Sequence, residues 1–299
     1  MRIRSNGIEI EVDVQGRADG VPLVLVMGLA MQLIGWPQEL VAHLVDRGFR
    51  VIRFDNRDSG LSDGFDHLGT PDMKAVALRR LLRLPIAAPY SLADMARDAI
   101  GVLDALGIPS AHFCGASMGG MIVQHIAAHH AERVRTVTLM MSSSGAKHLP
   151  GPSLRVLRAM YFSRRARNPQ AVIERRLRLK RLIGSPAYPT DPERARARLE
   201  ASSSRAWRPG GAARQTTAIL ADGDRTPLLS AIRAPTLVIH GCADVLVPVA
   251  AGHDLAARIP HARAQFIEGM GHELPLQLLE RFADLIAANA RRTSDQPTH

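Results

Sequence analysis

Short apolar runs alternate with segments of helical periodicity along most of this chain of 299 residues. Pro22–Met27, Val134–Met141 and Pro235–Ile239 are such runs, and each is followed closely by glycine or polar turn residues. Continuous apolar runs of this length are typical of strands buried on both faces, as in a parallel sheet that is covered by its crossover helices. The alternation therefore predicts an α/β fold with a mostly parallel, doubly wound sheet.

The alternation stops in residues 145–230, a segment that is rich in arginine, has helical spacing and shows no clear strand. We therefore predict a core domain made of residues 1–144 and 231–290. The segment between them is expected to form a helical cap, or lid, over the carboxyl ends of the strands. Residues 291–299 have no apolar pattern and are expected to form a flexible tail.

The net charge is +10, but aromatic residues make up only 4% of the chain. Nucleic-acid surfaces combine a localised basic patch with aromatic side chains on which bases stack, whereas most arginines here are scattered. The densest run, Arg155–Arg181, has apolar residues at near-helical spacing and is typical of the solvated face of amphipathic helices. It leaves attraction to anionic substrates or to a membrane surface open as an alternative. No nucleic-acid partner is expected.

Cysteine usage and the N-terminus bear on the compartment. Cys114 and Cys242 each lie beside a glycine, and two cysteines make no disulfide framework. The N-terminus lacks the apolar centre of a signal peptide, and no run approaches the roughly 18 apolar residues of a membrane span. We expect a cytoplasmic protein with no transmembrane segment.

The segment Gly115-Ala116-Ser117-Met118-Gly119 matches the pattern G-x-S-x-G. A strand, His112–Cys114, is expected before it, and a helix, Gly120–His130, after it. A sharp strand-to-helix turn exposes the serine hydroxyl, and the flanking glycines let the backbone pack where a Cβ would clash. The start of the helix also directs its positive dipole end at the site. Ser117 is therefore the candidate nucleophile.

A serine hydroxyl needs an adjacent base, and the base needs a carboxylate to orient it. Among hydrolases with this turn, the chain order is serine, acid, histidine. Asp244 follows the strand Pro235–Ile239, and His272 follows the last expected strand, so both lie past strand carboxyl ends. We predict that His272 is the base and Asp244 its orienting acid, with Glu268 as the reserve carboxylate.

Other titratable residues suit these roles less well. His240 lies one position before a turn glycine and is interpreted as structural, while the remaining candidates lie on or beside a helix: His253, Asp254 and His261. His125 and His129 lie four apart, as zinc ligands on a helix do, but lack the glutamate of the metalloprotease pattern and are expected on the helix surface. Arg57 and Asp58 are interpreted as a structural ion pair or turn network. No metal and no cofactor are expected.

Two N–H donors are needed where the oxygen of a tetrahedral intermediate forms. One is expected from Met118, the residue after the nucleophile, and the other from the loop Met27-Gly28-Leu29, where we choose Leu29. Methionines gather near the same strand ends and are interpreted as core filling, with an adaptable apolar pocket for the acyl or alkyl group as the alternative. They are Met27, Met31, Met118, Met121, Met140 and Met141.

Taken together, these residues resemble the α/β-hydrolase superfamily over about Ile8–Ala287. The segments VMGLAMQLIGWP, FDNRDSGLS and CGASMGGMIVQ resemble the branch that contains the aclacinomycin methylesterases. The resemblance implies the α/β-hydrolase fold and hydrolysis of carboxylic esters, with Leu29 and Met118 as oxyanion donors. Met27 stands where the superfamily often has histidine, and Asp58 replaces the first glycine of its D-x-R-G turn. Both variants are similar to those of the methylesterase branch.

The expected function is a serine hydrolase that cleaves an apolar carboxylic ester of small or medium size through an acyl-enzyme. The alternative on the same triad is cofactor-free, haloperoxidase-like perhydrolase chemistry or hydrolysis of a C–C bond. Dehalogenase chemistry is disfavoured because that family has aspartate where this chain has Ser117. A non-catalytic receptor of the same fold is a third hypothesis, against which the complete triad argues. The sequence leaves a homodimer open.

Overall fold

A computed structural model describes residues 1–163 and 169–293 of the chain. Within these residues, eight strands form one sheet in the order β1-β2-β4-β3-β5-β6-β7-β8. The strands from β3 to β8 pair in parallel, and β1 and β2 pair antiparallel at one edge. The predicted mostly parallel α/β sheet is confirmed. The strands are β1 (Arg2–Ser5), β2 (Ile8–Gln15), β3 (Val21–Val26), β4 (Phe49–Phe54), β5 (Ala111–Ala116), β6 (Val134–Met140), β7 (Thr236–Gly241) and β8 (Arg263–Ile267).

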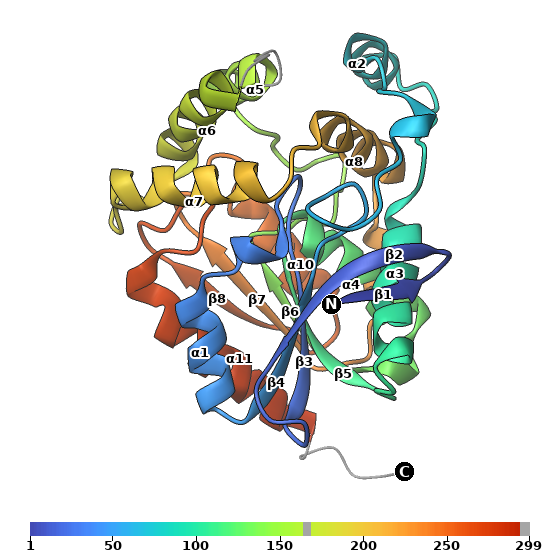
Figure 1. Ribbon diagram of the computed structural model, residues 1–299, viewed down its shortest axis with the longest axis vertical. Coiled ribbons are helices and arrows are strands. Elements are labelled where there is room, and N and C mark those ends of the chain that lie inside the picture. The colour runs from blue at the N-terminus through green and yellow to red at the C-terminus, as the bar shows by residue number, and fades with distance from the viewer. Residues whose placement is uncertain (164–168, 294–299) are drawn as a thin grey trace.

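Helices cover both faces of the sheet (Figure 1). One face packs on α1 and α11, and the other packs on α3, α4 and α10. In β3, Leu25 packs in the core on the face of α1 and α11, and Val24 packs in the core on the face of α3, α4 and α10. Successive side chains of a strand point to opposite faces of the sheet. Burial on both faces explains why the strand is continuously apolar. These helices are α1 (Gln38–Asp46), α3 (Leu92–Ala105), α4 (Met118–His129), α10 (Ala250–Arg258) and α11 (Leu279–Ala290).

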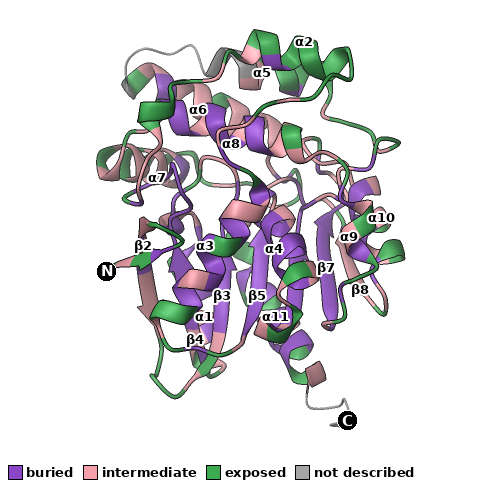
Figure 2. Cartoon of the chain, turned by 90° about the vertical axis from the view of Figure 1, so that its right-hand side faces the viewer, coloured by how far each residue is buried: buried purple, intermediate pink, exposed green. Residues whose placement is uncertain are grey.

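In the described residues between β6 and β7, four helices lie beyond the carboxyl ends of the strands, as Figures 1 and 2 show. They are α5 (Leu154–Ser163), α6 (Pro169–Ile183), α7 (Pro192–Arg205) and α8 (Pro209–Asp222). The short helix α9 (Thr226–Leu229) packs instead on α4 and α10, beside the sheet. The insertion contacts the core loops directly, since the Gln32 side chain donates to the Ser202 carbonyl at 2.7 Å. Helices therefore occupy the segment for which we predicted a cap, and its action as a lid stays a prediction. A further helix, α2 (Met73–Leu81), stands at the same end of the molecule.

Strand β1, the start of α3 and the start of the C-terminal tail can each be compared with the sequence prediction. Strand β1 was not foreseen, because four residues are too few to show a period; the turn Asn6-Gly7, with φ of 48° and 83°, closes it into a hairpin with β2. The helix α3 begins in the predicted capping box of Ser91 and Asp94. The start of the expected tail is folded: Arg291–Thr293 form the short helix η5, and residues 294–299 lie outside the described residues.

In the part of the chain that the structure describes, no helix combines the length and the apolar character needed to cross a bilayer.

Candidate active site

Ser117 lies at the turn between β5 and α4, with φ of 55° and ψ of −117°. This backbone conformation costs an L-residue energy, and neighbouring contacts hold it. The Ser117 N–H donates to the Met140 carbonyl at 2.9 Å, and the Ser142 hydroxyl donates to the Ser117 carbonyl at 2.8 Å. A Cβ on Gly119 would lie 2.0 Å from the Val26 carbonyl oxygen, so only glycine fits there. The G-x-S-x-G pattern is thus a packing requirement of this turn.

The structure brings the three predicted triad side chains together. His272 Nε2 lies 3.1 Å from Ser117 Oγ, and His272 Nδ1 lies 2.7 Å from Asp244 Oδ2. The other oxygen of the Asp244 carboxylate accepts the N–H groups of Leu246 at 2.9 Å and Val247 at 2.8 Å. Asp244 is buried, so these bonds fix its carboxylate and aim the free oxygen at the imidazole ring. The arrangement can draw the proton from the serine hydroxyl.

His240 supports this site from beneath. Its Nε2 lies 2.8 Å from the Val247 carbonyl oxygen and 3.7 Å from Asp244 Oδ2. Burial lowers the pKa of His240, which favours the neutral ring that donates to the carbonyl. The reserve carboxylate, Glu268, is exposed and lies beside Cys242. Asp244, not Glu268, is therefore the carboxylate that contacts His272.

The loop after β3 lies against the nucleophile. A Cβ on Gly28 would lie 3.3 Å from the Ser117 Cβ. Among the described residues, no hydrogen bond uses the Leu29 N–H. Met118 is the first residue of α4, so its N–H has no acceptor within the helix. The two predicted oxyanion donors, Leu29 and Met118, therefore belong to segments beside the Ser117 side chain. Within the described chain, the Leu29 N–H makes no hydrogen bond, and the Met118 N–H makes none within its helix.

Gln215, a buried residue of α8 that was not among the predicted site residues, holds this loop. Its Oε1 accepts the Ala30 N–H at 2.8 Å, and its Nε2 donates to the Arg57 carbonyl at 2.8 Å. Ala30 has a φ of 56°, so the bond stabilises an unfavourable backbone turn next to Leu29. No local pattern marks a glutamine in a distant helix for this task.

Four of the six methionines near the strand ends are buried, which fits core filling: Met27, Met118, Met140 and Met141. Met31 is 44% exposed, and Met121 is half-buried. A Cβ on Gly35 would lie 3.0 Å from the methyl carbons of both Met27 and Met31, so these two side chains meet near the loop.

Arg57 and Asp58 each form a buried ion pair, but they do not pair with each other. Arg57 pairs with Asp98 at 2.6 Å, and Asp58 pairs with Arg214 of α8 at 2.7 Å. The Tyr90 hydroxyl also donates to Asp58 at 2.7 Å. These residues join the loop after β4 to α3 and α8, so their role is structural.

His125, which we expected on the surface of α4, is buried beneath α8. Its Nε2 lies 2.9 Å from Asp222 Oδ1, and its ring stacks on His129 with centroids 5.8 Å apart. The expectation of a surface position is wrong for His125, because the insertion covers this part of the helix, whereas His129 is exposed as predicted. Among the described residues, no group of three or more histidine, cysteine, aspartate or glutamate side chains could hold a metal ion.

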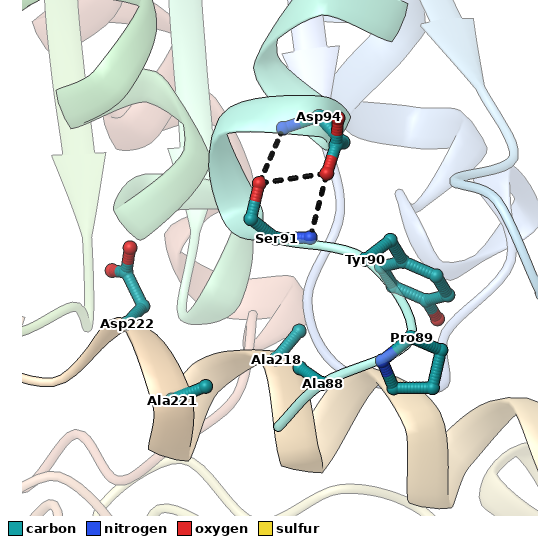
Figure 3. A pocket seen from close by; sticks show the side chains of 8 residues that line it. All are labelled: Ala88, Pro89, Tyr90, Ser91, Asp94, Ala218, Ala221 and Asp222. Carbon is teal, nitrogen blue, oxygen red and sulfur yellow. Dashed lines mark hydrogen bonds between the residues drawn. The ribbon is translucent and has the colours of Figure 1, made fainter. Parts of the chain in front are cut away.

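An open pocket of about 580 Å³ lies between the start of α3 and α8 (Figure 3). Residues 88–91 and Asp94 line one side, and Ala218, Ala221 and Asp222 line the other. Figure 3 shows Ser91 and Asp94 bonded to each other in the capping box. The lining contains no triad residue, so this hollow is separate from the candidate active site.

A family model for the alpha/beta hydrolase fold matches residues 21–277. The chain belongs to the α/β-hydrolase fold family. This hydrolase is 31% identical over 288 residues to rhodomycin D methylesterase DnrP of Streptomyces peucetius, a match that covers 90% of this chain and 91% of the relative. The resemblance to the methylesterase branch is confirmed.

Solved structures agree on the fold of this hydrolase. A meta-cleavage product hydrolase from Pseudomonas fluorescens IP01 matches with a TM-score of 0.76 and 22% identity, covering 98% of this chain and 97% of that one. A thermophilic esterase from Thermogutta terrifontis matches with a TM-score of 0.72 and 23% identity, covering 98% of this chain and 99% of that one.

Proposed function

We propose that this α/β-hydrolase is a serine hydrolase that cleaves carboxylic esters through an acyl-enzyme. The observation that carries the proposal is the continuous pair of contacts from Asp244 through His272 to the Ser117 hydroxyl, at 2.7 and 3.1 Å. In the proposed roles, Ser117 is the nucleophile, His272 the general base and Asp244 the orienting acid.

The chemistry follows from these contacts. Asp244 accepts a hydrogen bond from the N–H at His272 Nδ1, which keeps the ring proton on Nδ1 and leaves Nε2 unprotonated, facing the serine hydroxyl. His272 takes the hydroxyl proton as Ser117 Oγ attacks the ester carbonyl, and then delivers it to the departing alcohol. Water, activated by the same imidazole, releases the carboxylic acid and restores the free serine. Asp244 stabilises the imidazolium formed in each half of the reaction.

The negative oxygen of each tetrahedral intermediate would accept the N–H groups of Leu29 and Met118. Each such donor is worth about 3 kcal/mol of transition-state stabilisation. Because Met118 is the first residue of α4, its N–H lies at the positive end of the α4 dipole, which also stabilises the negative oxygen.

The relatives favour an ester as the substrate. Rhodomycin D methylesterases of two Streptomyces strains match 90% of this chain at 31% identity, and their names state ester cleavage. We infer that the perhydrolase and C–C hydrolase alternatives are secondary to this activity. We further propose that residues 145–230 act as a cap over the site and that exposed Met31, beside Met27, contributes to an apolar substrate pocket.

The decisive test compares wild type with Ser117→Ala on a panel of p-nitrophenyl esters of increasing acyl length. We expect the variant to lose hydrolysis while it keeps the thermal unfolding midpoint of the wild type. A fluorophosphonate probe should label the wild type and not the variant, and Ser230→Ala, at an exposed serine, serves as the matched control. Unchanged ester turnover in Ser117→Ala would contradict the proposal, as would peroxide-dependent halogenation in the absence of ester cleavage.

A further inference from the structure

The helix α2 buries only one of its nine residues, Val76. The leucines at its end point into solvent, and Leu81, the most exposed of them, is 78% accessible. Burial of a leucine normally stabilises a fold, so a short helix that leaves its leucines outside gains little from packing. This face of α2 is therefore apolar without a partner in the described structure.

The helix α5 repeats the same feature. Leu154 is 80% exposed and Leu157 is 46% exposed, while Val156 between them is fully buried. Single exposed leucines are ordinary on soluble proteins, but leucines that gather on two helices at one end of a molecule mark an interaction surface.

Both helices carry positive charge beside these leucines. Neither α2 nor α5 contains aspartate or glutamate. In the described part of the chain, arginines such as Arg57 and Arg214 form ion pairs with carboxylates. None of the arginines beside the exposed leucines forms such a pair there. We call this surface the leucine–arginine rim; it consists of Leu78, Leu81, Leu82, Leu84, Leu154 and Leu157 with Arg79, Arg80, Arg83, Arg155 and Arg158.

The rim occupies one end of the molecule. In both views α2 and α5 stand beyond the carboxyl ends of the strands, and in Figure 1 α5 lies at the left and α2 at the right of that end of the molecule. Figure 2 shows α2 almost entirely in the colour of exposed residues. A surface that meets this end of the molecule would touch both helices at once.

We propose that the leucine–arginine rim docks the protein on an anionic lipid surface. The leucines enter the boundary of the acyl chains, and the arginines bind the phosphate headgroups around them. Two copies of the chain fit each other poorly rim to rim, because that contact would oppose the arginines of one rim to those of the other. The proposal concerns binding and does not rest on the proposed hydrolysis.

The test is flotation of the full chain with vesicles of phosphatidylglycerol and, separately, of phosphatidylcholine. We expect binding to phosphatidylglycerol, weaker binding to phosphatidylcholine, and release by salt. Leu81→Ser with Leu82→Ser should weaken partitioning by about tenfold or more. Arg79→Gln, Arg80→Gln and Arg83→Gln together should weaken it by about fivefold for each arginine removed.

Matched controls lie at other exposed positions. Val21→Ser, at the amino end of β3, and Arg17→Gln, in the β2–β3 turn, should bind vesicles like the wild type. All variants should keep the wild-type unfolding midpoint, because the altered side chains are exposed. Absence of binding to phosphatidylglycerol would overturn the proposal, and so would equal losses in rim and control variants. A lipid-free dimer that dissociates in the rim variants, with no vesicle binding, would assign the rim to a second copy instead.

Discussion

The carbonyl of Ile183, the last residue of α6, accepts the backbone N–H of His272 at 2.7 Å. The insertion thus holds the loop that carries the proposed base. The approach is close: a Cβ on Gly271 would lie 2.2 Å from the Gly184 carbonyl oxygen and 2.5 Å from that of Ile183. Glycine is required at position 271 for this contact.

The substitution Gly271→Ala should therefore push α6 away from His272. We expect kcat to fall by about a hundredfold, because a shift of about 1 Å in a catalytic group has an effect of that size. Steady-state hydrolysis of a p-nitrophenyl ester measures it. Gly151→Ala is the matched control, since a Cβ there meets nothing within 4 Å, and it should leave kcat unchanged. Equal rates in the two variants would show that the contact does not position the base.

A second prediction concerns Gln215. Its replacement by leucine leaves the Ala30 N–H and the Arg57 carbonyl without their buried partner, at a cost of about 1–3 kcal/mol each. The loop that carries Leu29 should loosen, so kcat should fall by about tenfold or more while KM changes little. Gln277→Leu, at an exposed glutamine, is the control. A raised KM with unchanged kcat would instead give Gln215 a role in substrate binding.

A third prediction separates Asp244 from Glu268. Asp244→Asn keeps the shape of the side chain but presents the wrong hydrogen-bonding group to His272, and comparable triads then lose about 10⁴ in kcat. Glu268→Gln, at the exposed carboxylate near the same loops, should retain wild-type activity. A large loss in Glu268→Gln with little effect of Asp244→Asn would reverse the two assignments.

A fourth prediction concerns stability and pH. His112, in β5, is buried with its Nδ1 2.8 Å from the Thr136 hydroxyl, and burial, with a smaller effect of Arg135, lowers its pKa to about 4. The unfolded chain takes up a proton near pH 6.5, but the folded chain does not until about pH 4. Unfolding therefore becomes easier as the pH falls through this window, by roughly 3 kcal/mol from this residue.

Urea denaturation of wild type and His112→Asn at about pH 7 and about pH 4 measures this contribution. The variant should lose less stability between the two pH values, whatever its stability at neutral pH. His261→Asn, at an exposed histidine, should behave as the wild type does. Parallel curves for His112→Asn and wild type would refute the assignment.

Local features explain what could be predicted from the sequence. The strand β3 is apolar because both of its faces are buried. Ser117 is recognisable because the close packing of its turn requires glycine at positions 115 and 119. Asp244 and His272 follow from chain order and strand ends, and the structure brings them to the serine. Their catalytic roles stay predictions.

The features that could not be predicted from the sequence depend on contacts between residues outside the local pattern. Gln215 and Ile183 act through positions far away in the chain, and no periodicity reports such contacts. His125 was misplaced for the same reason, because the α8 residue that covers it, Asp222, carries no motif. The strand β1 depends on a hairpin turn at Asn6-Gly7 rather than on its own four residues.

The two bonds by which α6 and α8 reach the loops of His272 and Leu29 limit how this enzyme could be redesigned. A chimera that received the helices of another hydrolase, in order to accept new substrates, would lose the side-chain amide of Gln215 and would have to place a backbone carbonyl where that of Ile183 lies. Any graft would have to rebuild both attachment points before its new specificity could be expressed in turnover.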